Sequence, residues 1–302
     1  MALQKEIWLQ SIVENLFADN SFVSKSVNDS AFVNYKTVHI PNAGAPSKVV
    51  VNRTEKPAGI KTREDKDLTY TLDELTTDPI LIENIDTVQL SYDKRESVIS
   101  TDRAQLIEAA DSLILHKWGT GAESAVYYTT GDAVDAHTSA TATGQRKAIT
   151  RKDILALMTK FNQDNVSKQD RYILLDSIMY AQLLEDMTES DKRSFFACAN
   201  AEKGIIGSLY SFNFMERSQV LRLSTDEKIL GWDKAGVAGE LAAGFAWQKE
   251  CVSHALGNVD MFGDTGNPAY YGDIFSFLVM AGGACRRHDK KGVALIAGAA
   301  AE

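Results

Sequence analysis

The clearest pattern of apolar and polar positions lies between residues 93 and 118 and predicts a long helix. From Thr101 onward, apolar side chains recur every three or four positions, which is the spacing of a helix with one buried face. That face would consist of Ala104, Leu106, Ile107, Ala110, Leu113, Ile114 and Trp118. Ser100 and Thr101 can cap its start, and Gly119 can end it. We expect a helix from Thr101 to Trp118, or from about Asp93 if the first turns are included.

An N-terminal segment also has helical spacing but no obvious local core. Residues from Lys5 to Phe17 place Trp8 on an apolar side, and the polar stretch from Asp19 to Ser30 separates them from the rest. A helix on such a tether could bury its apolar side on another chain, and docking on its own domain is equally compatible. We expect residues 1–30 to serve assembly more than folding of the subunit.

Residues 35–75 predict a long hairpin. Tyr35 to Ile40 and Leu68 to Leu72 alternate as strands, and three of the five prolines lie between these two ends. The run Val49-Val50-Val51 predicts a further short strand. Connections beyond about 15 residues are usually functional or disordered, and this one is too polar to bury much of itself. We therefore predict a projecting arm that is stabilised by contact with another molecule.

The chain after the long helix predicts mixed α and β structure. Twenty of the 32 residues from Gly119 to Thr150 are Gly, Ala, Ser or Thr, which is typical of a flexible connector or surface loop. Helices are expected at Asp153–Phe161 and Ile178–Met187. Strands are expected at Tyr172–Leu175, Gly204–Phe214, Ala242–Ala246, Cys251–Met261, Ile274–Ala281 and Val293–Ala297.

Composition narrows the possible functions. The chain of 302 residues carries 32 basic and 41 acidic residues, a formal charge of −9, which argues against a protein that coats nucleic acid through a basic surface. No apolar run approaches the length of a membrane span, and the N-terminus lacks the apolar core of a signal peptide. The three widely spaced cysteines fit a reducing compartment.

Motifs that carry chemistry are missing from the sequence. Gly119-Thr120-Gly121 lacks the third glycine of a dinucleotide fingerprint, and no serine lies in a Gly-x-Ser-x-Gly elbow. Cys251 and His254 have the spacing of metal ligands, but a zinc site needs about four ligands and no second pair lies nearby. The carboxylates from Asp65 to Glu74 are explained as solvated charge on the arm. We expect no enzyme, no cofactor and no metal.

The order of these elements resembles that of a tailed-bacteriophage major capsid protein with the Hong Kong 97-type fold, an α+β fold. The segments that carry the resemblance are Asp102–Asp111 in the long helix, Thr143–Lys147, Tyr180–Asp186, and the closing Tyr271-Gly272-Asp273 with Arg286-Arg287 and Gly292-Val293. It covers nearly the whole chain and rests on the order of the motifs.

This resemblance implies a division into named parts. They are an N-arm (1–34), an extended hairpin called the E-loop (35–75), a P-domain with the spine helix and connector (76–150), an A-domain (151–250), return strands of the P-domain (251–291) and a C-terminal A-domain segment (292–302).

The resemblance also implies a function. The protein would self-assemble through hexamers and pentamers into an icosahedral shell around phage double-stranded DNA, assembled in the host bacterial cytoplasm. A portal is an expected partner, and the intact Met1 favours a separate scaffolding protein over a fused one. An encapsulin-like nanocompartment shell is the nearest alternative. An α/β enzyme with the hairpin as a lid, and a phage decoration protein, are others. Lys48, Lys56 and Lys61 could be cross-linking lysines, but no complete reaction set can be matched.

Contacts between copies are expected at both polar and apolar positions. Residues 48–63 carry five basic residues against Glu55 alone, so the arm would be basic on an acidic protein. The candidate contact residues are Trp8, Arg53, Lys56, Lys61, Asp73 and Glu74. Together with Asp78 and Glu83, the last two form one acidic set that the arm of a neighbour could meet.

Overall fold

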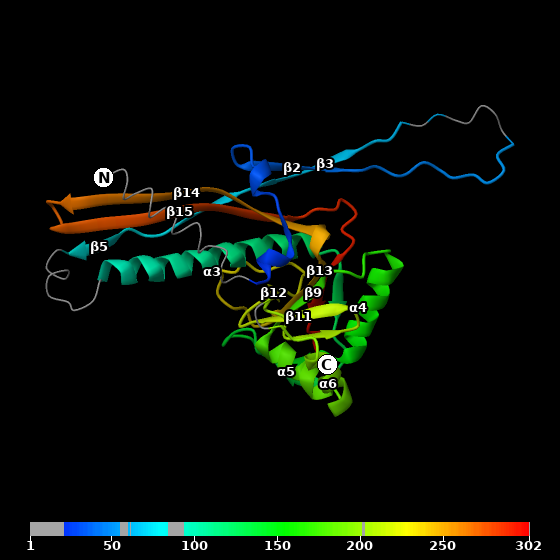
Figure 1. The fold of residues 1–302 in the computed structure, drawn as a ribbon. Helices are drawn as coiled ribbons and strands as arrows, with labels where there is room; N and C mark the ends of the chain where they lie inside the picture. Colours follow the sequence, from blue (N-terminus) through cyan, green and yellow to red (C-terminus); the bar gives the residue numbers. More distant parts are fainter. Residues whose placement is uncertain (1–20, 55–59, 61, 84–93, 201–202, 302) are drawn as a thin grey trace.

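The computed structural model describes residues 21–54, 60, 62–83, 94–200 and 203–301, and it is organised around one long helix and two main sheets (Figure 1). About 25% of the chain is helix and 37% is strand. The long helix, α3 (Lys94–Ala122), contributes side chains to the cores beneath both sheets. The predicted N-terminal helix and Trp8 lie outside the described residues. None of the described helices has the length and apolarity needed to cross a membrane.

The larger sheet has seven strands in the order β10-β11-β9-β13-β16-β6, with β12 also paired to β13. Its strands are β6 (Val126–Tyr128), β9 (Arg171–Asp176), β10 (Gly207–Leu209), β11 (Phe212–Arg217), β12 (Leu221–Leu223), β13 (Leu241–Gln248) and β16 (Val293–Ala297). Every residue of β9, β13 and β16 is buried, which explains their continuous apolar runs. The predicted strands at these three places are confirmed.

Helices α4 (Arg151–Gln163), α5 (Ser177–Asp186) and α6 (Glu189–Phe196) contribute the core on one face of this sheet. Ile154, Leu157 and Phe161 of α4 are buried there, as their spacing predicts. The opposite face belongs to a second core, in which Trp118 of α3 stacks on Phe245 at 6.0 Å between ring centroids. The sheet is therefore a central layer between α3 and the three shorter helices.

The second sheet has five strands and is much longer than it is wide. Its central pair is β14 (Val252–Asn267) with β15 (Gly272–Cys285), and β15 also pairs with β4 (Asp73–Thr76) and β5 (Ile80–Glu83). A short strand β1 (Val27–Asn28) pairs with β14 at Ser253 and His254. The middle of α3 packs on this sheet through Leu106, Ala110 and Leu113.

The arm consists of β2 (Thr37–Asn42), β3 (Lys66–Thr71) and the chain between them. The two strands pair antiparallel from Thr37 with Thr71 to Asn42 with Lys66. Only Leu72, which is buried, separates β3 from β4 in the long sheet. The arm and the tip of the β14–β15 hairpin point toward opposite ends of the molecule (Figure 1).

The predicted long helix is confirmed in its extended form, but its predicted end at Gly119 is wrong. The helix continues to Ala122. A Cβ atom at position 119 would lie 2.7 Å from Leu221 Cδ1, and one at position 121 would lie 2.6 Å from Cys285 Sγ. These glycines therefore permit close packing of the helix on its neighbours instead of ending it.

Two further predictions of local structure are wrong. The run Val49-Val50-Val51 forms no strand, because the arm offers it no pairing partner in the described chain. The segment after the helix is more ordered than a connector: β6 joins the seven-stranded sheet beside β16, and β7 (Ala133–Asp135) pairs with β8 (Gln145–Lys147). Local composition could not show these pairings, since the partner of β6 lies far along the sequence.

The end of the N-terminal tether also differs from expectation. The short 3-10 helices η1 (Val23–Lys25) and η2 (Ser30–Phe32) flank β1, and Phe22 and Val23 lie in the core beside Trp118. The Trp247 indole N–H donates to the Lys25 carbonyl oxygen at 2.9 Å. Residues 21–30 are therefore part of the folded subunit, and the expectation that they serve assembly more than folding is wrong.

Candidate inter-subunit contact surfaces

The outer part of the arm exposes apolar side chains that its own chain does not cover. Val49, Val51 and Ile60 are 89%, 82% and 99% exposed. Exposed apolar groups that gather on one projecting element are typical of a surface that meets another molecule. Arg53 lies beside them and is also exposed, whereas Lys56 and Lys61 fall outside the described residues.

The base of the arm is held by the turn that follows β15. The Asn42 amide donates to the Arg286 carbonyl oxygen at 3.0 Å, and its oxygen accepts from the His288 N–H at 3.2 Å. Between the arm and this turn lies a cavity of about 760 Å³, whose charged and imidazole lining consists of Lys48, Arg63, Glu64, Lys66, Arg287, His288 and Asp289.

Two of these arginines are already neutralised by neighbouring carboxylates. Arg63 bonds Asp65 at 2.6 Å, and Arg287 bonds Asp289 at 2.7 Å. The hydrogen bond from Arg287 lowers the pKa of Asp289 to about 2, so that pair stays ionised at any ordinary pH. Lys48 and Lys66 form no ion pair with a carboxylate in the described part of the chain. Glu64 also lines the cavity, but Lys48 and Lys66 together outnumber it, so the cavity presents a net positive charge.

The two predicted acidic contact residues are engaged within their own chain. Asp73 pairs with Lys117 of α3 at 2.7 Å, and Glu74 pairs with Lys36 just before β2. Both carboxylates lie on β4 in the long sheet, on a different element from Arg53. Exposed pairs of this kind contribute about 0–1 kcal/mol each, so a competing partner could displace them, but they are not vacant acceptors.

The acidic set expected from the sequence contains Glu83 but not the aspartates at the far end of β14–β15. Residues 260–273 include Asp260, Asp264 and Asp273 and no basic residue, and Glu83 of β5 lies opposite Gly272 in the ladder. We call these four residues the acidic end. Tyr270 and Tyr271 at the same hairpin tip are 57% and 78% exposed. The signal was available in the sequence as a stretch of aspartates without a compensating lysine or arginine.

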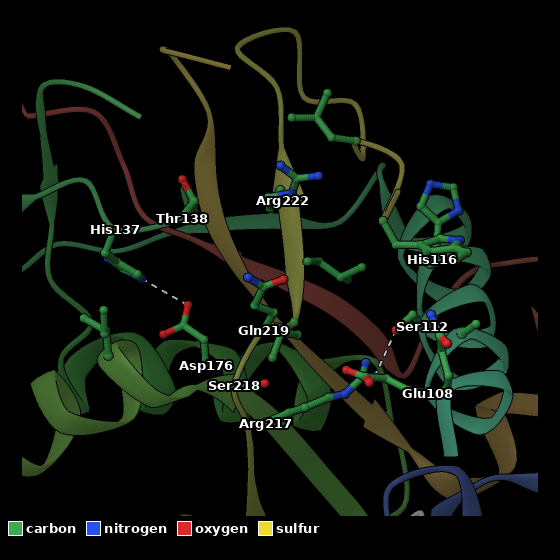
Figure 2. A pocket seen from close by; sticks show the side chains of 17 residues that line it. Glu108, Ser112, His116, His137, Thr138, Asp176, Arg217, Ser218, Gln219 and Arg222 are labelled. Atoms are coloured by element: carbon green, nitrogen blue, oxygen red, sulfur yellow. Dashed lines mark hydrogen bonds and ion pairs between the residues drawn. The ribbon is translucent and has the colours of Figure 1, made fainter. Parts of the chain in front are cut away.

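A second cavity, of about 640 Å³, lies between α3 and the β11–β12 segment (Figure 2). His137 bonds Asp176 at 3.1 Å, and the other Asp176 oxygen caps α5 by accepting from the Met179 N–H at 2.7 Å. Arg217 donates to the Ser112 hydroxyl at 2.9 Å. In the described chain no hydrogen bond joins Ser218 to His137, so these two residues do not form the contact between a nucleophile and its base. The Arg217–Ser112 bond joins α3 to β11, and the His137–Asp176 bond joins the segment after β7 to β9.

The Cys251 and His254 spacing corresponds to no metal arrangement in the described residues, where no group of three or more potential ligands converges. Cys251 is buried, and burial raises the pKa of its thiol to about 11. His254 is also buried and bonds the Ser26 hydroxyl through Nδ1 at 2.6 Å. Both residues serve to pack the N-terminal segment and the two sheets together.

No protein-family description matches this sequence, and no curated protein matches it. Solved structures do match the fold. The capsid of cyanophage P-SCSP1u is 14% identical, with 92% of this chain and 87% of that chain covered and a TM-score of 0.64. The head of Helicobacter pylori bacteriophage KHP40 is 13% identical, with 94% and 92% covered and a TM-score of 0.62. A virus-like particle from Pyrococcus furiosus is 10% identical, with 97% and 99% covered and a TM-score of 0.54.

These matches span nearly the full length of both partners, so they concern the whole architecture and not one shared motif. The expected α+β class and Hong Kong 97-type fold are confirmed. At 10–14% identity the likeness establishes the fold and leaves function to be argued from the surfaces described above.

Proposed function

We propose that this chain is a major capsid protein that self-assembles into the icosahedral shell of a tailed phage around double-stranded DNA. The observation that carries the proposal is the arm, which projects from the subunit and leaves Val49, Val51 and Ile60 almost fully exposed. An element of this shape gains stability only when another molecule covers it. A shell in which each copy lends its arm to a neighbour supplies that cover at every position.

The domain ranges, hexamers and pentamers, a separate scaffolding protein, a portal and assembly in the host cytoplasm belong to the same proposal. So does the absence of enzymatic activity, which is supported by a fold shared with capsid chains. A formal charge of −9 suits a lining that does not hold DNA tightly, because phosphate binding by lysine and arginine grows with each contact.

The direct test is expression of the full chain, followed by negative-stain microscopy and sedimentation velocity. Closed shells, or capsomers of five and six copies, support the proposal. A protein that stays monomeric at every concentration and salt would contradict it and favour an enzyme with a lid.

An encapsulin-like shell is the second candidate, supported by the match to the virus-like particle from Pyrococcus furiosus. The two differ in cargo. Particles purified from the native source should protect DNA from added nuclease if the shell belongs to a phage, and should contain a co-purifying protein without protected DNA if it is a nanocompartment.

A further inference from the structure

Charge is distributed very unevenly between the two ends of this molecule. The arm residues 43–66 contain six basic and three acidic residues, and the turn 286–291 contains four basic residues against Asp289. These two segments together carry +6 on a chain whose total is −9, so the remaining residues carry −15. The arm lies at one end of the molecule, and the acidic end of β14–β15 lies at the other (Figure 1).

The basic surface is formed by two elements that are far apart in the sequence. We call Lys48, Arg63, Lys66, Arg287 and His288 the basic groove; they line the cavity between the arm and the turn. The bonds from Asn42 to Arg286 and His288 hold the two sides together. With Arg63 and Arg287 neutralised locally, Lys48 and Lys66 supply the positive charge that remains for a partner, and Glu64 in the same lining offsets part of it.

The acidic end offers carboxylates of the opposite kind. Asp264 is exposed and accepts a hydrogen bond from the neutral Asn267 amide at 2.7 Å, and Glu83 is exposed on the adjoining strand. Neither Asp260 nor Asp264 forms an ion pair with a described lysine or arginine. Phe262, Tyr270 and Tyr271 add exposed apolar area beside these charges, which an interface between proteins would bury.

We propose that the acidic end of one copy binds in the basic groove of the next copy. The groove lies at the base of the arm, and the acidic end lies at the far tip of β14–β15, which points the opposite way (Figure 1), so one copy cannot satisfy both by itself. A contact between two different surfaces is heterologous, and repetition of such a contact closes a ring when the rotation between copies allows it. This inference rests on the proposed function and names the surfaces through which neighbouring copies meet.

The ion pairs of Asp73 and Glu74 support this assignment over a contact through these two members of the acidic set expected from the sequence. Those carboxylates already pair with Lys117 and Lys36, whereas the acidic end has no such described partners at Asp260 and Asp264. A carboxylate that forms no ion pair within its own chain loses no such interaction when it binds a lysine of a neighbouring copy.

Charge exchange provides the test. Three forms of the full chain would be compared with wild type by sedimentation velocity and negative-stain microscopy: Lys48→Glu with Lys66→Glu, Asp260→Lys with Asp264→Lys, and all four substitutions together. Lys152→Glu with Lys168→Glu serves as the control, because both lysines are exposed on or just after α4 and neither lines the groove or belongs to the acidic end. Circular dichroism establishes that each variant is folded.

Each two-site variant should raise the concentration needed for association about tenfold at about 0.05 M salt, since two exposed pairs become repulsive. The difference from wild type should narrow at about 0.5 M salt, where charges are screened. The four-site variant should associate like wild type, because the exchanged charges again attract, and the control should also associate like wild type.

Two results would overturn the inference: normal association of either two-site variant at low salt, or a four-site variant no better than the two-site ones. A monomeric wild type would overturn it as well. A wild type that associates but forms neither closed shells nor capsomers of five and six copies would count against the proposed function alone, because the charge exchange would still report on this contact.

Discussion

At the scale of single residues, His254 links the N-terminal segment to the long sheet through its hydrogen bond with Ser26. The single Ser26 hydroxyl proton is donated to the Val23 carbonyl oxygen at 2.6 Å, so His254 Nδ1–H must donate to Ser26 Oγ. Burial lowers the pKa of His254 to about 4. The unfolded chain, with an ordinary histidine pKa of about 6.5, therefore takes up protons first as the pH falls, and stability is lost between these two values.

We predict that the folded subunit loses about 2 kcal/mol of stability from this residue between pH 7 and pH 5. His254→Asn keeps a donor near the Nδ1 position and cannot titrate, so its unfolding free energy should fall less over the same range. Denaturant melts of both proteins at the two pH values measure the difference. Equal losses would mean that His254 does not control the acid sensitivity.

Leu113 tests the packing of α3 on the long sheet. It lies with Ala110 and Ala281 in a small core and is 8% exposed. Leu113→Asp would bury a charge without a partner at a cost of several kcal/mol, and we expect it to prevent soluble assembly. Leu113→Met preserves volume and should cost less than about 1.5 kcal/mol. Soluble fractions and particle counts compare the two, and normal assembly of the aspartate variant would contradict the assigned buried face.

At the scale of elements, the N-terminal segment divides at about residue 21. Deleting residues 1–20 leaves Phe22, Val23 and β1 in place, so the circular dichroism and melting temperature of the subunit should stay near wild type. Deleting residues 1–34 removes these contacts, and loss of the Phe22 ring alone should cost about 3–5 kcal/mol. Thermal melts of the two truncations make the comparison. Equal melting temperatures would show that the segment contributes nothing to folding.

The same elements show how far the sequence could predict the fold. Some elements are predictable because burial on a regular helix or strand produces a repeating pattern in the local sequence. Examples are the continuous apolar run Tyr172–Leu175, which forms a strand, and the helical spacing of Ile154, Leu157 and Phe161. The sequence alone does not predict the end of α3, because Gly119 packs against Leu221, which lies about a hundred residues further along the chain. The strand at Val49–Val51 was mispredicted because β-branched residues favour a strand only where a partner exists. The sequence shows the aspartates of the acidic end, but only the structure shows that they lie on the side of the molecule opposite the arm (Figure 1).

At the scale of the whole molecule, the arm is expected to meet a neighbour through its charges as well as its valines. Reversing Arg53, Lys56 and Lys61 to glutamate should leave the subunit folded and slow assembly at low salt. Wild-type association should weaken as salt rises, and that of the variant should not, because its attractive pairs are already lost. Light scattering across a salt series measures both rates. A control variant in which Lys152, Lys168 and Lys203 are reversed to glutamate should assemble like wild type. If the arm variant also assembled like wild type, the arm lysines and arginine would serve only to maintain solubility.

The single-residue junction at Leu72 gives the arm a mechanical role. A pull on the arm travels along β3 into β4 without an intervening loop, and β4 pairs with β15 from Asp73 with Ala281 to Thr76 with Leu278. Ladder hydrogen bonds lie perpendicular to the strands, so a force along β4 loads all of them in shear at once. The load passes to β15, and α3 packs on this strand through Ala110 and Leu113, which contact Ala281. Tension between neighbouring copies would thus be borne by the β4–β15 ladder and by α3 packed on it, and in a closed shell an outward push from the contents would be resisted along strands.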